Sequence, residues 1–170
     1  MKTFSSLSEV SGLVLLASML AGASARGETP KSVAALAGTW KLIAADVLHP
    51  DGTRGRDYGE HPHGMLSIDA QGRYAAQIYK SERLKFAAAD KAKGTAAELA
   101  SAVLGSSSHF GRLEIDVARQ ALVYHIEGAA FPNWEGTDQV RVFELHGDEL
   151  SYKVPARPNG DVPITVWKRL

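Results

Sequence analysis

The chain has 170 residues, with 19 basic and 19 acidic side chains and no cysteine. The balanced charge, without a basic block, argues against a nucleic-acid partner, because binding to a phosphate backbone needs clustered Lys and Arg. The lack of cysteine excludes disulfides, thiol chemistry and cysteine-ligated zinc or iron–sulfur centres. The fold must therefore be stabilised by its core alone.

Residues 1–25 have the three-part layout of a secretory signal peptide. A basic start is followed by an apolar run at 13–20, and small residues at 23–25 form an A-x-A cleavage site. The apolar run is too short to span a bilayer comfortably. We expect cleavage after Ala25, export to a periplasmic or extracellular compartment, and no stable membrane span afterwards. Glu9 interrupts the basic start, so an uncleaved anchor is the alternative.

The rest of the chain has the size of one ordinary domain, since removal of residues 1–25 leaves 145 residues. Residues 26–37 are expected to form a linker and a short N-terminal helix capped by Ser32. Residues 38–170 then form the folded domain. No internal repeat or low-complexity tract divides it further.

Short segments with a two-residue hydrophobic period dominate this domain, and Gly, Pro and Asp separate them, which is typical of strands and turns. In the first segment, at 39–48, Trp40, Leu42 and Ala44 are expected to share one face. Ala45 is expected on the opposite face. Seven further strands are expected at 65–69, 73–79, 109–116, 121–127, 139–145, 149–154 and 163–170.

One helical region interrupts the strands. Residues 81–108 are rich in Ala, Lys and Glu, and Thr95 followed by Glu98 matches a capping box. The region is one helix, or two helices divided at its central glycine. Leu99 and Val103 stand four residues apart, so this apolar face is expected to lie on the barrel. About eight short antiparallel strands with one inserted helix indicate an all-β, up-and-down barrel.

The strand at 139–145 places a cation on an apolar face. Arg141 shares its side of the strand with Phe143 and Leu145. A buried guanidinium stays protonated and must find an acceptor, a π-face or an anion. Two interpretations follow: Arg141 stacks on a core Trp, or it contacts the anionic group of a ligand. Trp134 in the preceding loop carries a large aromatic group toward the same region.

The sequence does not decide which face of the strand at 121–127 points into the barrel. Val123 and His125 share one side, and Tyr124 lies on the other. If His125 faces inward, it joins Arg141 in a polar cluster that orients a ligand or serves as a general acid or base. The alternative is a wall histidine without a reactive role. The candidate ligand-binding residues are therefore Arg141, His125, Trp134, Tyr124 and Phe143, and no catalytic residue is assigned.

Two other histidine-containing segments suggest chemistry only weakly. His61 and His63 flank a proline, and with His49 upstream they lack a carboxylate at a recognisable spacing, so neither a metal nor another cofactor is expected. The serines at 106–108 precede His109, yet no Gly-x-Ser-x-Gly elbow is present. This segment is interpreted as a connection from helix to strand, and a hydrolase is not expected.

Several motifs carry a family resemblance over nearly the whole expected domain. They are residues 36–42 around Gly38-Thr39-Trp40, Tyr58-Gly59, Pro62-His63-Gly64, Gly72, Thr95, Glu98, His125, the Pro-Asn-Trp-Glu-Gly loop at 132–136, Arg141, residues 147–150 and Trp167-Lys168-Arg169. With these motifs the chain resembles the lipocalin-like domain family, bacterial and fungal relatives of the lipocalins within the calycin group. The resemblance implies an antiparallel barrel of roughly eight strands around a pocket open at one end.

The resemblance also implies which end is closed. In lipocalins the Trp of the first strand packs at the closed end against an Arg near the end of the barrel. Trp40 and Arg169 hold these positions here, which leaves Arg141 for another role. Residues 105–111 depart from the Tyr-rich segment of the family, so no ligand contact is carried over to them.

Three functions from different classes remain open at this point. The first is an exported barrel that binds a small, largely apolar molecule with one polar or anionic group near Arg141 and His125. The second is a cofactor-free cyclase or isomerase, an activity that the resemblance implies is available to the fold. The third is a filled barrel with a structural or interaction role. Fold alone does not decide among them, and the oligomeric state is not indicated.

Overall fold

The computed structural model describes residues 30–170, so the signal peptide expected at 1–25 lies outside the described residues. The elements are η1 (Val33–Leu36), β1 (Gly38–Leu48), β2 (Arg54–Gly55), β3 (His63–Ile68), β4 (Arg73–Tyr79), η2 (Lys91–Lys93), α1 (Ala96–Leu104), β5 (Ser106–Asp116), β6 (Ala121–Ala129), η3 (Pro132–Trp134), β7 (Asp138–His146), β8 (Glu149–Lys153) and β9 (Val162–Arg169). Within this part of the chain, every helix is too short or too polar to cross a membrane.

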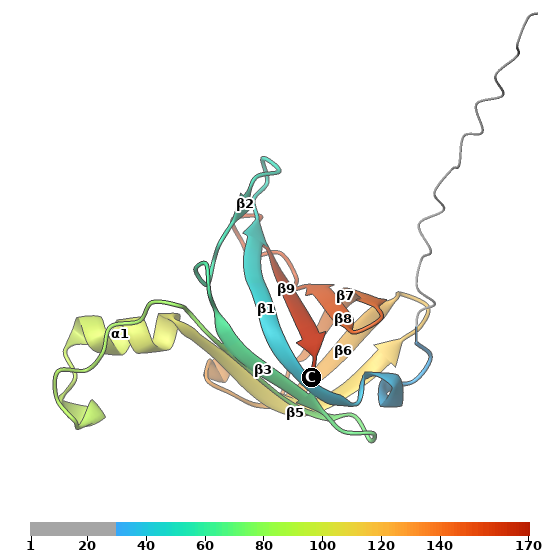
Figure 1. Ribbon diagram of the computed structural model, residues 1–170, viewed down its shortest axis with the longest axis horizontal. Helices are drawn as coiled ribbons and strands as arrows, with labels where there is room; N and C mark the ends of the chain where they lie inside the picture. The colour runs from blue at the N-terminus through green and yellow to red at the C-terminus, as the bar shows by residue number, and fades with distance from the viewer. Residues whose placement is uncertain (1–29) are drawn as a thin grey trace, which may run out of the picture.

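Eight antiparallel strands form a closed barrel, as the sequence predicts. Each strand from β3 to β8 pairs with its successor in the chain, and β1 pairs with both β3 and β9, which closes the sheet. The two-residue strand β2 pairs only with the last residues of β1 and rises above the rim (Figure 1). Closure removes the exposed strand edges that an open sheet of this size would present.

The first strand departs from simple alternation. Its pairing with β9 shifts between Leu42 and Ala44, so Ile43 is an extra, exposed residue in the ladder. Because a bulge adds one residue, every side chain after it changes face. Ala45 therefore pairs with Thr165 and is buried, and the prediction that it lies opposite Trp40 and Leu42 is wrong.

One end of the barrel is closed by the contact that the resemblance implies. The Arg169 guanidinium carbon lies 4.1 Å from the centroid of the Trp40 ring. The same guanidinium donates to the carbonyl oxygens of Ala37 and Ala35 at 2.6 and 2.9 Å, and Trp40 Nε1 donates to Leu36 O at 3.0 Å. These bonds hold η1 across the end of the barrel, where Leu36 and Trp40 are fully buried.

The helical region differs from the expectation. α1 has the predicted capping box, in which Thr95 N donates to Glu98 Oε2 at 2.7 Å and Glu98 N donates to Thr95 Oγ1 at 3.3 Å. The helix does not lie on the barrel, however, because it projects sideways ahead of the start of β5 (Figure 1). Leu99 and Val103 are exposed. The residues that precede α1 fold against the helix itself: Ala87 N donates to Glu98 Oε1 at 2.7 Å.

Candidate functional site

The half of the barrel away from Trp40 contains a cavity of about 350 Å³. Its walls come from β1, β4, β5, β7, β8 and β9 and from loops at the rim. The lining residues are Ala45, Asp46, Asp57, Tyr58, Ala76, Ile78, Ser107, His109, Trp134, Gln139, Arg141, Tyr152, Val154, Pro155, Ala156, Arg157, Pro163, Ile164 and Thr165. This volume is at the lower end of the range for small-molecule sites, about 300 to 1,000 Å³. A barrel filled by its own side chains would not leave such a space.

Arg141 on β7 is the central polar group of the pocket. It is 3% exposed, and its Nη2 donates to Gln139 Oε1 at 2.7 Å and to His109 Nε2 at 3.2 Å. The guanidinium carbon lies 4.1 Å from the ring centroid of Tyr124 and 5.1 Å from that of Tyr152. The stacking partners are thus tyrosines, not the Trp that one interpretation of the sequence expected. The Arg141 Nε atom is buried and has no hydrogen-bond partner.

His109 and Tyr74 hold this guanidinium in place. His109 Nδ1 lies 2.8 Å from the Tyr74 hydroxyl oxygen. Burial and the neighbouring charge of Arg141 lower the pKa of His109 to about 3, so the ring is neutral at physiological pH. Because Nε2 must accept from Arg141, we assign the proton to Nδ1, which donates to Tyr74. Burial also raises the pKa of Tyr74, so the Tyr74 hydroxyl and the His109 ring are both uncharged.

Other charges that line the pocket are already paired. Asp46, which is 4% exposed, accepts from Arg54 Nε at 2.7 Å. Asp57 accepts from Arg157 Nη2 at 2.5 Å, and this bond links the loop after β2 to the loop after β8 across the mouth. Among residues 30–170 no ion pair involves Arg141. The pocket therefore holds one buried positive charge that no carboxylate compensates.

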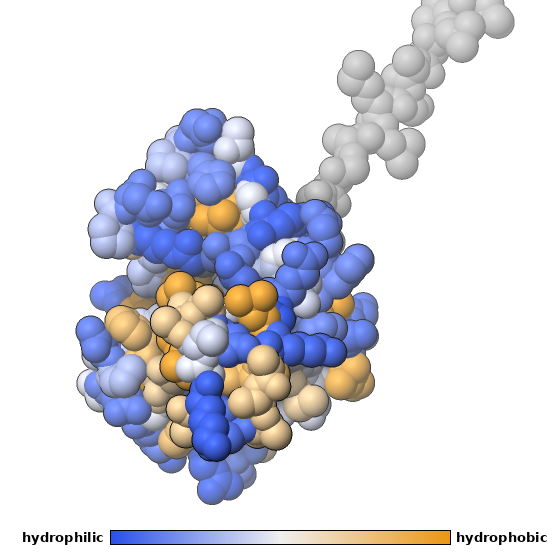
Figure 2. All heavy atoms as spheres, turned by 90° about the vertical axis from the view of Figure 1, so that its left-hand side faces the viewer, coloured by the Kyte–Doolittle hydropathy of each residue, from blue (hydrophilic) through white to orange (hydrophobic). Residues whose placement is uncertain are grey.

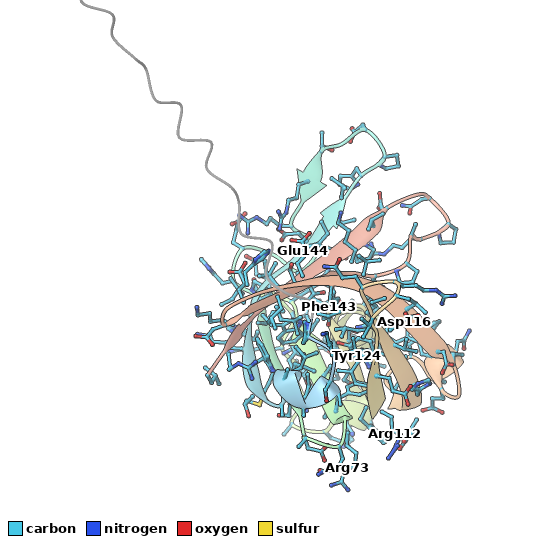
Figure 3. All side chains as sticks on the ribbon, turned by 90° about the vertical axis from the view of Figure 1, so that its right-hand side faces the viewer. Arg73, Arg112, Asp116, Tyr124, Phe143 and Glu144 are labelled. Atoms are coloured by element: carbon cyan, nitrogen blue, oxygen red, sulfur yellow. The ribbon has the colours of Figure 1, made fainter. Side chains whose placement is uncertain are left out.

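Four of the five predicted site residues lie inside the barrel or at its rim, at different depths. Arg141 and Trp134 line the pocket. Tyr124 lies beneath the guanidinium, and Phe143 is part of the core; both are completely or almost completely buried and neither lines the cavity. Figure 3 shows Tyr124 and Phe143 within the barrel and Arg112 at its outside.

The fifth, His125, is on the outer wall, so its prediction as a pocket residue is wrong. Its Nδ1 lies 2.7 Å from Asp138 Oδ1, and its Nε2 lies 3.6 Å from Glu114 Oε2. The inner face of β6 is the one that carries Tyr124, flanked by two buried aliphatic residues. The polar partner that His125 was expected to supply comes instead from β5, as His109.

His109 is not among the site residues that the sequence suggests, because the serines before it are interpreted as a connection from helix to strand. These residues form the start of β5, with Ser107 and His109 facing the pocket. The usable signal was the alternation of His109 with Leu113 through the intervening glycine, which extends the strand face back to the histidine.

The three histidines considered as metal ligands do not come together. His49 Nδ1 lies 2.8 Å from Asp161 Oδ1, whereas His61 and His63 are exposed at the rim. In the part of the chain that the structure describes, no group of three or more His, Asp or Glu side chains is arranged to hold a metal ion.

The family to which the chain belongs follows from comparison with family models. The family model described as "Lipocalin-like domain" matches residues 37–170. No curated protein sequence matches the chain. Among solved structures, a crystal structure of a mutant of the fluorescent protein UnaG is similar at 15% identity, over 81% of this chain and 97% of that one, with a TM-score of 0.36. The match of the family model over the whole barrel shows that this chain belongs to the lipocalin-like domain family.

Proposed function

We propose that this protein binds a small, largely apolar molecule with one anionic group, and that the anionic group contacts Arg141. The observation that carries the proposal is the buried, unpaired charge of Arg141 on the wall of the pocket. A buried cation without a counter-ion is unfavourable, and a carboxylate or a similar anion in the pocket would compensate it. The free Nε–H offers one more donor for such a group.

The other residues that line the pocket are suited to the apolar part of this ligand. Ala76, Ile78 and Val154 contribute aliphatic surface, and Trp134 contributes an aromatic side chain near the mouth. The cavity volume suits a molecule of roughly ten to twenty non-hydrogen atoms. We infer that the ligand enters through the open end of the barrel, with its anionic end first, toward Arg141.

Binding accounts for the geometry better than catalysis does. His109 is the pocket histidine, and both of its ring nitrogens are engaged, by Tyr74 and by Arg141. A general base needs a free lone pair within reach of the substrate proton. The arrangement therefore orients the guanidinium and leaves no ring nitrogen of His109 for proton transfer. As the sequence suggests, we also propose that the protein acts after export.

The test compares a charged probe with its neutral counterpart. Binding of decanoate and of 1-decanol would be measured by calorimetry for the unaltered protein and for Arg141→Met, which keeps much of the stem volume. We expect decanoate affinity to fall by about 2 to 5 kcal/mol, because its carboxylate loses a buried charged partner, and decanol affinity to stay nearly constant. Arg112→Met, on the outer wall, is the matched control and should change neither affinity.

The opposite pattern would contradict the proposal. If Arg141→Met lowers the melting temperature and leaves decanoate affinity unchanged in the folded fraction, Arg141 is a structural partner of the tyrosines. Equal losses for decanoate and decanol would show that the residue shapes the pocket without recognising charge.

A further inference from the structure

An exposed apolar surface lies outside the barrel, on the excursion of the chain between β4 and β5 (residues 80–105). We call it the α1 patch, and it consists of four large aliphatic side chains: Leu84 (57% exposed), Leu99 (44%), Val103 (66%) and Leu104 (74%). Figure 2 looks onto this side of the molecule and shows hydrophobic (orange) and intermediate (tan) side chains gathered there, with hydrophilic (blue) ones around and across them. Grouped apolar exposure of this kind marks an interaction surface.

The patch is a preformed surface rather than a loose loop. Lys80 N donates to Gly105 O at 2.8 Å, which ties the two ends of the excursion together. Leu84 N donates to Ser101 Oγ at 2.9 Å, so the chain before α1 is fixed against the helix. The capping box fixes the start of α1. These bonds present the apolar side chains in one arrangement before any partner arrives, which lowers the entropic cost of docking.

The charges of the excursion indicate the kind of partner. Residues 80–105 carry five basic side chains, Lys80, Arg83, Lys85, Lys91 and Lys93, against three acidic ones, in a chain that is neutral overall. Within residues 30–170 none of the five takes part in an ion pair. One of the acids, Glu98, is buried and accepts hydrogen bonds from Thr95 and Ala87. Lys80 and Arg83 lie over the rings of Tyr58 and Tyr79, but no carboxylate compensates their charge. The uncompensated charges near the patch are thus mainly positive.

A second copy of the chain would fit this surface poorly. In a two-fold symmetric dimer the same patch faces itself, so the unpaired cations of both copies would be brought together. A bilayer that contains anionic phospholipid satisfies both features, because it accepts aliphatic side chains at its interface and attracts Lys and Arg to its headgroups. We propose that the α1 patch docks the protein on an anionic phospholipid surface.

Docking in this way would bring the mouth of the pocket to the lipid. The excursion starts and ends at the pair Tyr79 and Ser106, and the adjacent Ile78 and Ser107 line the pocket. Exchange of a ligand between bilayer and barrel would then need only a short path. This consequence rests on the proposed function, whereas docking itself does not.

The experiment measures co-sedimentation of the full chain with phosphatidylcholine vesicles that contain or lack phosphatidylglycerol. The unaltered protein should bind the anionic vesicles more tightly, and raising the salt from about 0.1 M to about 1 M should weaken binding because the screening length falls from about 10 to about 3 Å. Val103→Glu should lower the partition coefficient at least about tenfold, since it removes an inserting side chain and adds a negative charge.

Val142→Glu is the matched control, because Val142 is 56% exposed on the barrel wall and receives the same charge. Both variants keep the same N-terminal segment, so any contribution of that segment to vesicle binding cancels when the two variants are compared. The proposal is overturned if the two variants bind equally, if the unaltered protein shows no preference for phosphatidylglycerol, or if sedimentation equilibrium shows a dimer that Val103→Glu dissociates. Arg141→Met should bind vesicles normally, so a failure of the ligand proposal and a failure of docking give different results.

Discussion

Arg141 shows how a barrel tolerates a cation in its interior. Two tyrosine rings face its guanidinium at 4.1 and 5.1 Å, and neutral acceptors on Gln139 and His109 take its N–H groups. Cation–π contacts at desolvated sites stabilise by about 2 kcal/mol, less than the cost of burying an unpaired charge. The contacts therefore offset only part of the cost of burying the guanidinium in the empty pocket, and an anion would offset more of it.

The pH dependence of stability tests the neutral state of His109. Its pKa is about 3 in the folded protein and 6.5 in its ordinary state, so below about pH 6 the unfolded chain binds a proton that the folded one does not. The contribution of neutral His109 to the free energy of unfolding is therefore complete above pH 6.5. It is lost as the pH falls toward 3, by up to about 1.4 kcal/mol per pH unit.

In His109→Gln, urea unfolding between about pH 7 and pH 4 should show a shallower decline than in the unaltered protein. The carboxylates titrate in both chains, so the difference between the two curves isolates the histidine. Parallel curves would mean that His109 is charged, or solvated, in the folded state.

Truncation of Trp40 tests the closed end of the barrel. Trp40 is fully buried, stacks on Arg169 and donates to Leu36 O, so Trp40→Ala leaves a cavity and removes the anchor of η1. The free energy of unfolding should fall by about 3 to 5 kcal/mol. Trp134→Ala is the control: Trp134 is half-buried at the rim, so its truncation should lower the free energy of unfolding much less. Similar melting temperatures for Trp40→Ala and the unaltered protein would contradict the packing described above.

At the level of the element, irregularities in two strands decide which side chains face the pocket. The pairing of β5 with β6 shifts between Phe110 and Gly111, where Glu127 is the extra residue on β6, and the pairing of β1 with β9 shifts after Leu42. Such bulges bend the strand and reset its alternation, which lets a small barrel curve tightly. Gly111 has φ of 155° and lies two residues from His109 on the same face of β5.

Substitution of Gly111 should therefore affect both the sheet and the site. A Cβ at Gly111 would overlap the backbone carbonyl oxygen of His125 on the paired strand. We expect Gly111→Ala to destabilise the fold by about 3 kcal/mol or more, since the backbone must move. Gly136→Ala is the control: Gly136 has φ of 71° but open space around it, so only about 1 kcal/mol of backbone strain should appear. Equal melting temperatures for the two variants would show that the bulge can relax.

At the scale of the whole molecule, the barrel has one sealed end and one open end. η1, Trp40 and Arg169 seal the first, and the second carries β2, the α1 excursion and the loops joined by Asp57 and Arg157. Stability and binding are thus assigned to opposite ends. Variants at the sealed end should change the melting temperature, and variants at the open end should change affinity.

Export is a prediction about the whole chain and concerns residues outside the described part. If the signal peptide is cleaved after the small residues at 23–25, mass spectrometry of the protein isolated from its producing cells should find Arg26 as the first residue. A soluble protein that still begins at Met1 or Lys2 would refute cleavage.

Sequence alone determined the barrel and its sealed end. Alternation in short segments predicts strands, and closely spaced turns predict antiparallel neighbours. The family resemblance that the motifs around Trp40 and Arg169 carry implies which end closes. The capping box of α1 was also predicted correctly, because Thr95 and Glu98 are three residues apart and the interaction is local. Arg141 was located for the same reason, since its strand face follows from its immediate neighbours.

Only the tertiary structure decided what shares the pocket with Arg141. The face of His125 depends on which side of β6 turns inward, and alternation alone leaves both possible. Ala45 changed face because of a bulge that depends on the fit between β1 and β9. The exposure of Leu99 and Val103 depends on where β4 and β5 end, since an amphipathic helix does not specify what it packs against. Local patterns fix the elements, but contacts between distant segments fix the site.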